Sequence, residues 1–524
     1  MDELKELVAL VQRNKFKRID IMGHPGNHRA SLVQELYDGL ASGKFEDEAS
    51  AAEHFYADSE NKNGYFGRLK KRLQNRLINT LFFIDVSASP GATAISKAYY
   101  SCYKDYASFF ILIGRHGRTA AVHVAEKSIE KAKHFHFTKI VLDLSRELAY
   151  HFSALDYNKV KADHYLSLAN EFQEYDSWEW KAQMLYNQLA QNYSKSRASM
   201  NRISAQAELA VNELEPLIGK IKTYRFVQIA YKVLSLRYLS VSDYKNALKI
   251  NSLGLTFFKE NSHLASNTVI GGLQLQILAC HLQMGNFQKA YDFAQKTCSI
   301  FESGSLSWYS TMEYYFLTAC HSGDYPKAYS IFREAFEHKG FKHLLPARSE
   351  PWYIYQTYVQ YFIATGRAQS APDDPYKWNR FKLAKLLNEV PTFSQDKQGI
   401  NISILAIQIL FWLHQRDYDA VIQRTDALKA YAYRYLRNDE TYRSNCFIKI
   451  LETLSSTDFH KLAVLRKAQK YYDLMRARSM DIAKPNAEIE IVPYETLWEF
   501  LMQDLDEEFH PVRKRRSGSK SKDG

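Results

Sequence analysis

A short pattern recurs along this chain: Asp or Asn, an aromatic residue, two variable residues and then a small residue. It is clearest in "GNFQKA" (285–290) and "GDYPKA" (323–328), where Gly comes first and the two alanines lie 38 residues apart. In a pair of antiparallel helices, Gly ends the first helix in the left-handed conformation, and Asp or Asn caps the second. The small residue then lets the helices cross closely. The pattern predicts a chain of successive helical hairpins.

Looser copies extend this pattern over much of the sequence. Gly and Pro, which interrupt helices, number only 21 and 12 among 524 residues, so long helices are favoured. The chain is therefore predicted to be all-α. The small residues expected where two helices cross are Ala121, Val160, Ser196, Ala247, Ala290, Ala328 and Val421.

These turns resemble those of the tetratricopeptide repeat (TPR), whose consensus turn is Gly-Asp-Tyr-x-x-Ala. The best copy matches further, because Phe332 and Ala335 follow Ala328 by four and seven residues, as in the family. Spacings between the small residues exceed the family period of about 34 residues, so longer helices or loops are expected. The resemblance implies a right-handed α-solenoid of TPR-like helical hairpins, whose first helices line a concave surface.

Four parts are expected along the chain. They are an N-terminal helical domain at 1–95, a TPR-like α-solenoid at 96–480, a C-terminal capping segment at 481–511 and a disordered basic tail at 512–524. Apolar periodicity predicts helices near 2–14, 28–41, 46–57 and 64–86 in the first part, and a capping helix near 494–508 in the third.

The helix expected at 64–86 combines an apolar stripe with cations in its first half, namely Arg68, Lys70, Lys71, Arg72 and Arg76. Three interpretations stay open. The cations could form the solvated side of an amphipathic helix, contact nucleic-acid phosphates in a helix-turn-helix, or bind an acidic protein surface. The connection expected at 57–64 is longer than the usual helix-turn-helix turn, which favours the solvated side.

One stretch, "GRHGRT" (114–119), looks like the phosphate pocket of a histidine phosphatase, where a strand leads into Arg-His-Gly. However, helical periodicity flanks it on both sides, and Ala121 falls at the small-residue position of the repeated pattern. We therefore interpret His116 as part of a turn between two helices.

Other candidate chemical motifs fail on spacing. "GHPGNHRAS" (23–31) lacks the Lys and the Ser or Thr of a Walker phosphate loop. His134 and His136 are two residues apart and would point to different sides of a helix. The adjacent Cys and His of "ACH", at 279–281 and 319–321, cannot form a catalytic dyad on a helix. We expect no catalytic, cofactor-binding or metal-ligating residues.

Charge and cysteine content indicate the cellular setting. The net charge is +11, and the tail from Arg513 to Gly524 supplies +5 of it, from six basic residues and one acidic residue. The five cysteines are scattered without a Cys-x-x-Cys pair, which is typical of buried thiols in a reducing compartment. The longest apolar run, 402–413, is too short to span a bilayer. These features predict a cytoplasmic protein without membrane insertion.

Together these patterns predict a non-enzymatic scaffold or adaptor that binds a peptide or protein segment in the concave groove of a TPR-like solenoid. The alternative is a sensor-regulator, in which the N-terminal helices bind nucleic acid while the solenoid reads a ligand or peptide. The N-terminal basic helix and the C-terminal tail are the two candidate contacts for nucleic acid.

Overall fold

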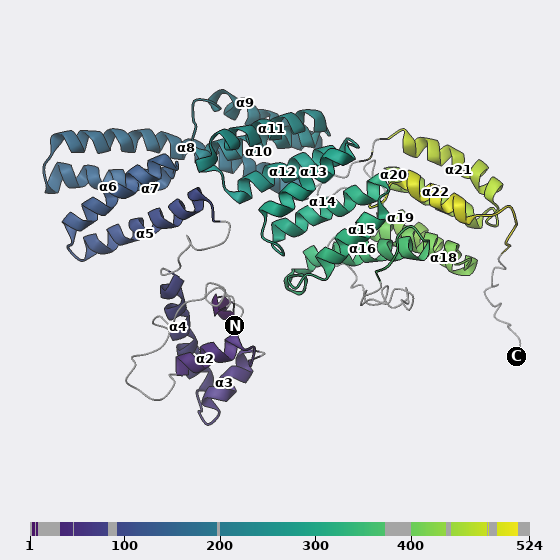
Figure 1. The fold of residues 1–524 in the computed structure, drawn as a ribbon, viewed down its shortest axis with the longest axis horizontal. Coiled ribbons are helices and arrows are strands. Elements are labelled where there is room, and N and C mark those ends of the chain that lie inside the picture. The colour runs from purple at the N-terminus through teal and green to yellow at the C-terminus, as the bar shows by residue number, and fades with distance from the viewer. Residues whose placement is uncertain are drawn as a thin grey trace, which may run out of the picture. The chain divides into compact units, whose positions relative to one another are not determined.

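The computed structural model describes residues 3–5, 7–8, 32–45, 47–81, 92–195, 200–371, 400–435, 442–478, 480 and 490–511. Within these ranges the regular structure is helical and contains no β-sheet, which confirms the all-α prediction for them (Figure 1). None of the helices in these ranges has both the length and the apolar character needed to cross a bilayer.

The chain forms two compact units, Met1–Glu174 and Tyr175–Gly524. The division falls inside one long helix, α8 (Lys159–Lys195), which contributes to both units. It coincides with none of the boundaries expected at 95, 480 and 511. The tail expected at 512–524 lies outside the described residues.

Three helices near the N-terminus, α2 (Leu32–Ala41), α3 (Glu48–Tyr56) and α4 (Lys62–Leu81), share a small core. Asp47 caps α3 by accepting a hydrogen bond from the backbone N–H of Ser50 at 2.8 Å. The helix expected near 2–14 lies largely outside the described residues. Buried apolar side chains of this core are Leu4, Val8, Val33, Leu36, Leu40, Phe45, Ala51, Ala52, Phe66, Leu69, Leu73 and Leu77.

The rest of the first unit contains two consecutive hairpins. Their helices are α5 (Ala94–Gly114), α6 (Arg118–His134), α7 (Thr138–Tyr150) and the start of α8, with a π-helical turn at His151–Leu155 between α7 and α8. The stretch that looked like a phosphatase pocket is the turn between α5 and α6, as predicted. There the backbone N–H of Gly117 donates to the carbonyl of Leu112 at 2.8 Å.

In the second unit, helices that are consecutive in sequence pack against one another. They are α9 (Met200–Leu214), α10 (Tyr224–Ser240), α11 (Tyr244–Glu260), α12 (Asn267–Gln283), α13 (Phe287–Ile300), α14 (Leu306–Ser322), α15 (Tyr325–Phe336), α16 (Pro346–Ala364), α18 (Ile400–His414), α19 (Tyr418–Tyr435), α20 (Tyr442–Ser455), α21 (Lys461–Arg476) and α22 (Tyr494–Asp504). The helix predicted near 494–508 is thus α22, and it ends at Asp504.

The hairpin turns share one backbone geometry. At Gly323 the φ angle is 78°, and the following Asp324 accepts a hydrogen bond from the backbone N–H of Lys327 at 3.0 Å, which caps α15. Gly285 has a φ of 71° at the equivalent place before α13. Both glycines are left-handed, as the pattern predicts. Residues other than Gly fill the same left-handed position in other turns, namely His116, His136, Ser242 and Arg416.

Five of the seven predicted small residues are fully buried. Each of these five is the fourth residue of its helix. The side chains of Ala121, Ala247, Ala290, Ala328 and Val421 are all 0% exposed.

Val160 was wrongly assigned to this position. It is 80% exposed, because α8 is capped by Asn158 rather than Asp156: the side chain of Asn158 accepts from the backbone N–H of Lys161 at 3.1 Å. The residue four positions after this cap is Ala162, which is 9% exposed. The correct register is therefore two residues further along.

The predicted hairpin turn at 192–196 is also wrong. Asn192 and Tyr193 lie within α8, which continues to Lys195, so no turn interrupts the helix there. Ser196 itself lies outside the described residues.

Candidate interaction surfaces

Helix α4 places its cations on two different sides. Its 20 residues contain six basic residues and no acidic residue. Phe66, Leu69, Leu73 and Leu77 are buried against α2 and α3, and the opposite side is open. We call this open side the basic face of α4; its exposed residues are Arg68, Lys71, Arg72, Asn75, Ile78 and Asn79.

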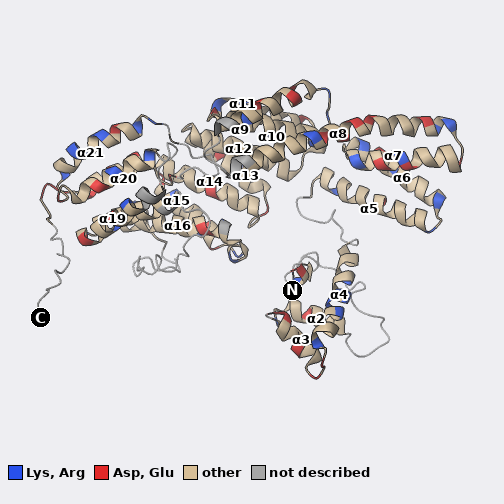
Figure 2. Cartoon of the chain, turned by 180° about the vertical axis from the view of Figure 1, so that it is seen from behind, with Lys and Arg blue, Asp and Glu red and all other residues tan. Residues whose placement is uncertain are grey.

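The five predicted contact residues are therefore not equivalent. The ammonium of Lys70 lies 2.6 Å from a carboxylate oxygen of Glu48 on α3, so it ties two helices together. Arg76 is only half-buried and lies at the border of the open side. Of the five cations, only Arg68, Lys71 and Arg72 are exposed on the basic face. The Arg68 guanidinium lies over the ring of Tyr65, 5.7 Å from its centroid. In Figure 2, α4 carries basic charges alone, whereas acidic residues lie on α2 and α3.

Helix α5 has an exposed aromatic side. The rings of Tyr99, Tyr103, Tyr106 and Phe110 follow one another along the helix, with centroids 4.5, 6.4 and 5.0 Å apart. Tyr99, Tyr103 and Phe110 are each more than 40% exposed. We call these four residues the tyrosine stripe. Its edge is fixed by α7, because the Tyr106 hydroxyl donates to the Asp143 carboxylate at 3.1 Å.

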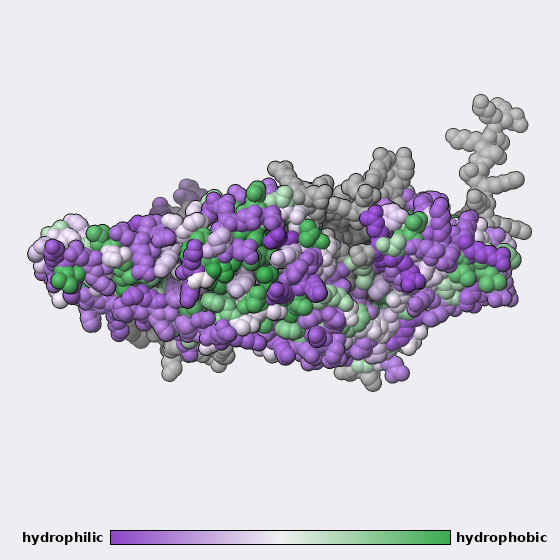
Figure 3. Space-filling model, turned by 90° about the horizontal axis from the view of Figure 1, so that it is seen from above, coloured by the Kyte–Doolittle hydropathy of each residue, from purple (hydrophilic) through white to green (hydrophobic). Residues whose placement is uncertain are grey.

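The tyrosine stripe is unusual for its density of exposed apolar groups. Elsewhere, large apolar side chains reach the surface in patches separated by hydrophilic residues (Figure 3). Helix α5 has more of them than any other described helix and only three charged residues among 21. Its exposed large side chains are Tyr99, Tyr100, Tyr103, Phe110, Ile111 and Ile113.

The C-terminal segment from Glu490 onward packs across several helices of the second unit. The ring of Tyr494 stacks on Phe447 of α20, with centroids 4.4 Å apart. Phe500 lies 6.0 Å from the ring of Tyr361, and the Arg367 guanidinium lies over Phe500 at 3.8 Å. The predicted capping helix therefore covers α16 and α18 as well as the last hairpin.

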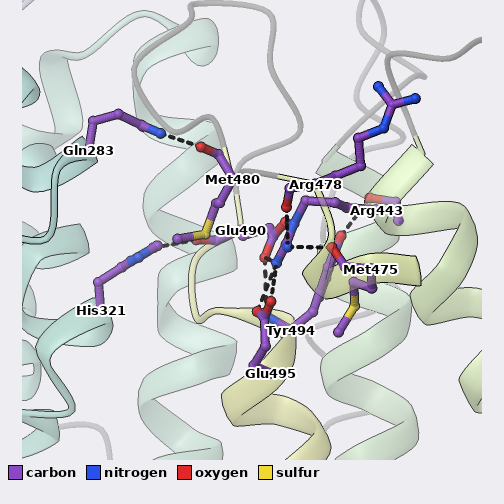
Figure 4. A network of polar contacts seen from close by, with 10 residues as sticks. Gln283, His321, Arg443, Met475, Arg478, Met480, Glu490, Tyr494 and Glu495 are labelled. Carbon is purple, nitrogen blue, oxygen red and sulfur yellow. Dashed lines mark hydrogen bonds and ion pairs between the residues drawn. The ribbon is translucent and has the colours of Figure 1, made fainter. Parts of the chain in front are cut away.

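A network around Arg443 of α20 fixes this segment (Figure 4). The Arg443 guanidinium pairs with the carboxylates of Glu490 at 2.6 Å and Glu495 at 2.8 Å. It also donates to the carbonyl oxygens of Met475 and Arg478, both at 2.9 Å. The Arg443 and Glu490 side chains are only 10% and 4% exposed, so the pair is largely removed from water.

Two hydrogen bonds connect Glu490 of this segment, and Met480 before it, to much earlier hairpins. His321 of α14 bonds through Nε2 to the carbonyl oxygen of Glu490 at 2.6 Å, and the Gln283 side chain of α12 donates to the carbonyl of Met480. These pairs are 169 and 197 residues apart in sequence. The C-terminal part of the chain thus contacts helices from the middle of the second unit's series, α12 and α14.

The charges of this network are set by burial and by their partners. Burial opposes the charge on Arg443, but its bonds to Glu490 and Glu495 outweigh this and raise the pKa of the guanidinium. Burial raises the pKa of the Glu490 carboxyl, and the contact with Arg443 limits the rise. Burial lowers the pKa of His321 to about 4, so its ring is neutral at physiological pH and Nε2–H is the donor to Glu490.

The thiols next to histidines are not activated. Burial raises the pKa of Cys280 to about 12 and raises that of Cys320 well above its usual value. Burial also lowers the pKa of His281, so neither member of that pair is charged near neutral pH. The described residues contain no group of His, Cys, Asp or Glu side chains arranged to hold a metal ion. The region of the rejected Walker pattern, 23–31, lies outside the described residues.

Sequence reasoning missed the Arg443 network entirely. The only local signal lay just before α22, where Glu490 is followed by two apolar residues, Ile491 and Val492, which are buried in the structure. Comparisons of this chain with protein-family models, with curated proteins and with solved structures found no match.

Proposed function

We propose that this chain is a non-enzymatic scaffold or adaptor, whose TPR-like hairpins form a right-handed solenoid and bind a peptide or protein segment along their first helices. The observation that supports it most directly is the tyrosine stripe, an exposed aromatic surface on the first helix of a hairpin. Exposed apolar surface of this kind on a folded protein marks an interaction site.

The pattern of helix contacts supports the solenoid. The first helix of one hairpin contacts the first helix of the next at α5 and α7, at α12 and α14, and at α16 and α18. In a stack of hairpins this places the first helices side by side along one surface. Within the first unit, the tyrosine stripe lies on such a first helix, α5, at its border with α7.

The chemistry of the stripe favours a partner segment low in charge. Tyrosine rings supply large, rigid contact area at a small cost in side-chain entropy, and their hydroxyl groups can bond to a peptide backbone. Each aromatic ring covered by a partner removes apolar surface from water, at about 25 cal/mol per Å². Asp143 and Arg146, an i,i+3 pair on α7, border the stripe and supply the polar rim.

The test is capture of a partner by the full chain and by two matched triple variants. The first variant carries Tyr99→Ser, Tyr103→Ser and Phe110→Ser. The control carries Tyr157→Ser, Val160→Ser and Leu166→Ser, which are 76%, 80% and 55% exposed in the same unit but lie outside the stripe.

A protein retained by the wild type and the control but lost by the stripe variant supports the proposal. Its binding segment is then measured as a synthetic peptide by fluorescence anisotropy. If the stripe variant retains every partner, or if both variants lose the same ones, the proposed surface is wrong.

A further inference from the structure

The basic face of α4 is a charged surface that the proposed scaffold function does not use. Its cations Arg68, Lys71 and Arg72 are exposed, and Lys71 and Arg72 have no ion-pair partner among the described residues. Other cations of the same helix are neutralised within the fold, since Lys62 pairs with Glu53 and Lys70 with Glu48. The free positive charge of α4 is thus gathered on one side.

We propose that the basic face of α4 binds double-stranded DNA, with α4 lying in the major groove. A helix with its side chains is about 10–12 Å across, and the major groove of DNA is about 12 Å wide. The face has no acidic residue along its whole length, which suits an approach to two phosphate strands. Helices α2 and α3 pack on the opposite side of α4.

The residue types on the face match those that read base edges. Residues 68, 71, 72, 75 and 79 share one side of the helix, because the last four follow Arg68 by three residues, four residues or sums of these. Arg and Asn at such positions bond to guanine and adenine edges respectively. Asn75 and Asn79 continue the stripe begun by the cations, so the face offers phosphate contacts and base contacts together.

The connection between α3 and α4 is shorter than the sequence suggested, which weakens the objection to a helix-turn-helix. Helix α4 begins at Lys62, so the connection is residues 57–61 and not the longer segment expected from the pattern. The shorter connection brings this pair of helices nearer to a helix-turn-helix, in which the second helix enters the groove.

Duplex DNA fits the face better than other nucleic acids do. Single strands are held mainly by stacking of bases on aromatic side chains. Among the described residues of α4, the one exposed aromatic ring, Tyr65, already lies against Arg68. Duplex RNA has a major groove too narrow for a helix. An acidic protein surface would be matched by the cations but would leave Asn75 and Asn79 unused.

The experiment measures binding of the full chain to a labelled DNA duplex by fluorescence anisotropy over a range of salt concentrations. The test variant carries Arg68→Glu, Lys71→Glu and Arg72→Glu, and a milder variant carries Gln at the same three positions. With three phosphate contacts, the slope of log K against log salt should become shallower by about 3 in the Gln variant, at about 0.9 per contact. Asn75→Ala should change the preferred sequence but not the slope.

The matched control reverses three exposed cations on another helix, with Arg466→Glu, Lys467→Glu and Lys470→Glu on α21. It changes the net charge equally and leaves α4 intact. A variant that ends at Val512 reports the contribution of the basic tail separately. Circular dichroism checks that each variant keeps its helix content.

The proposal predicts that the wild type prefers duplex DNA to duplex RNA and to single strands, and that only the α4 variants lose this preference. It is overturned if the wild type does not bind the duplex at low salt, or if the α21 control loses as much affinity as the α4 variant. Equal binding of duplex RNA would also overturn it. Capture of an acidic protein through α4, without DNA binding, would assign the face to protein recognition.

Discussion

The first hairpin, α5 with α6, and the last, α20 with α21, are built alike but end differently. In both, one side of the first helix carries aromatic residues, Tyr99 and Phe110 on α5 and Phe447 on α20. In the last hairpin this side is covered by the chain's own C-terminal segment: Phe447 is 0% exposed beneath Tyr494. In the first hairpin, Tyr99 and Phe110 remain 44% and 42% exposed.

This difference in cover distinguishes residues that contribute to stability from residues that are exposed to a partner. A hairpin cannot bury the outer side of its first helix alone, so that side needs either chain from the same protein or a partner. Where the chain supplies the cover, the contacts contribute to folding and include a buried ion pair. Where it does not, the exposed rings contribute little to folding and remain available for binding. Each prediction below tests one side of this contrast.

The largest effect is expected at the covered end. Arg443→Ala would leave the Glu490 carboxylate buried without its partner, which should destabilise the second unit by about 3–5 kcal/mol. Chemical denaturation measures the loss, and hydrogen exchange should locate it in residues 494–504. Lys449→Ala, which removes an exposed ion pair with Glu452 on the same helix, should cost less than about 1 kcal/mol. If Arg443→Ala and Lys449→Ala cost the same stability, the ion pair between Arg443 and Glu490 does not hold the C-terminal segment in place.

The second effect depends on pH and comes from His321. Its pKa in the folded chain is about 4, below the usual value of about 6.5, so the unfolded chain binds more protons between these values. Stability should therefore be complete above about pH 6.5 and fall as the pH drops towards 4, by at most about 3 kcal/mol, since partial exposure reduces the shift.

Comparison with His321→Gln isolates this contribution to the pH dependence. The wild type should lose more stability than the variant between pH 6.5 and 4 in thermal melts, because Gln does not titrate. Parallel curves for the two proteins would mean that protonation of His321 does not contribute to the pH dependence of stability.

The third effect tests whether both hairpin types share the same close crossing. Ala121→Leu in the first hairpin and Ala328→Leu in the second unit insert bulk at fully buried positions, and each should cost about 1–3 kcal/mol. Val160→Leu, at the misassigned exposed position, should change stability by less than about 0.5 kcal/mol. Thermal melts compare the three. A large cost at Val160 would contradict the register based on Asn158.

The register error shows where local patterns stop being informative. Asp156 and Asn158 are both good capping residues, and the sequence alone offers no reason to prefer the second. The choice follows from the π-helical turn at His151–Leu155, which lets the backbone N–H of Asn158 donate to the carbonyl of Phe152 at 2.9 Å. That turn is a product of packing. By contrast, Gly323 and Asp324 have no competing neighbours, and their roles were predictable.

The candidate sites show the same limit. The charge of α4 was readable from sequence, but its division into paired and exposed cations was not, because Lys70 meets Glu48 only after α3 and α4 have packed. The partners of Arg443 lie 47 and 52 residues away, and no periodicity links them. The exposure of the tyrosine stripe could not be predicted either, because a helix with periodic aromatic residues has the same sequence pattern whether or not another helix covers it.

A fourth, smaller effect concerns the turn of the first hairpin. His116 has a φ of 62°, a left-handed conformation that is strained for any residue except Gly, and its side chain is exposed. His116→Gly should therefore stabilise the first unit by about 0.5–1 kcal/mol after the greater chain entropy of unfolded Gly is allowed for. Gly323→Ala should have the opposite sign, because no atom lies near a Cβ there and only the backbone angle opposes it. Thermal melts of the two variants should shift in opposite directions.

The smallest effect on stability is expected at the tyrosine stripe of the first hairpin. This prediction tests most directly whether the first and last hairpins differ as described. Tyr99→Ser and Tyr103→Ser remove rings that are already more than 40% exposed, so each should change the free energy of unfolding by less than about 1 kcal/mol. Phe447→Ala at the covered end should cost about 3–5 kcal/mol, because a fully buried ring is replaced by a cavity. Denaturation of the single variants measures both. If the tyrosine variants unfold as easily as Phe447→Ala, the stripe is part of the folded core, and the open end is not a binding surface.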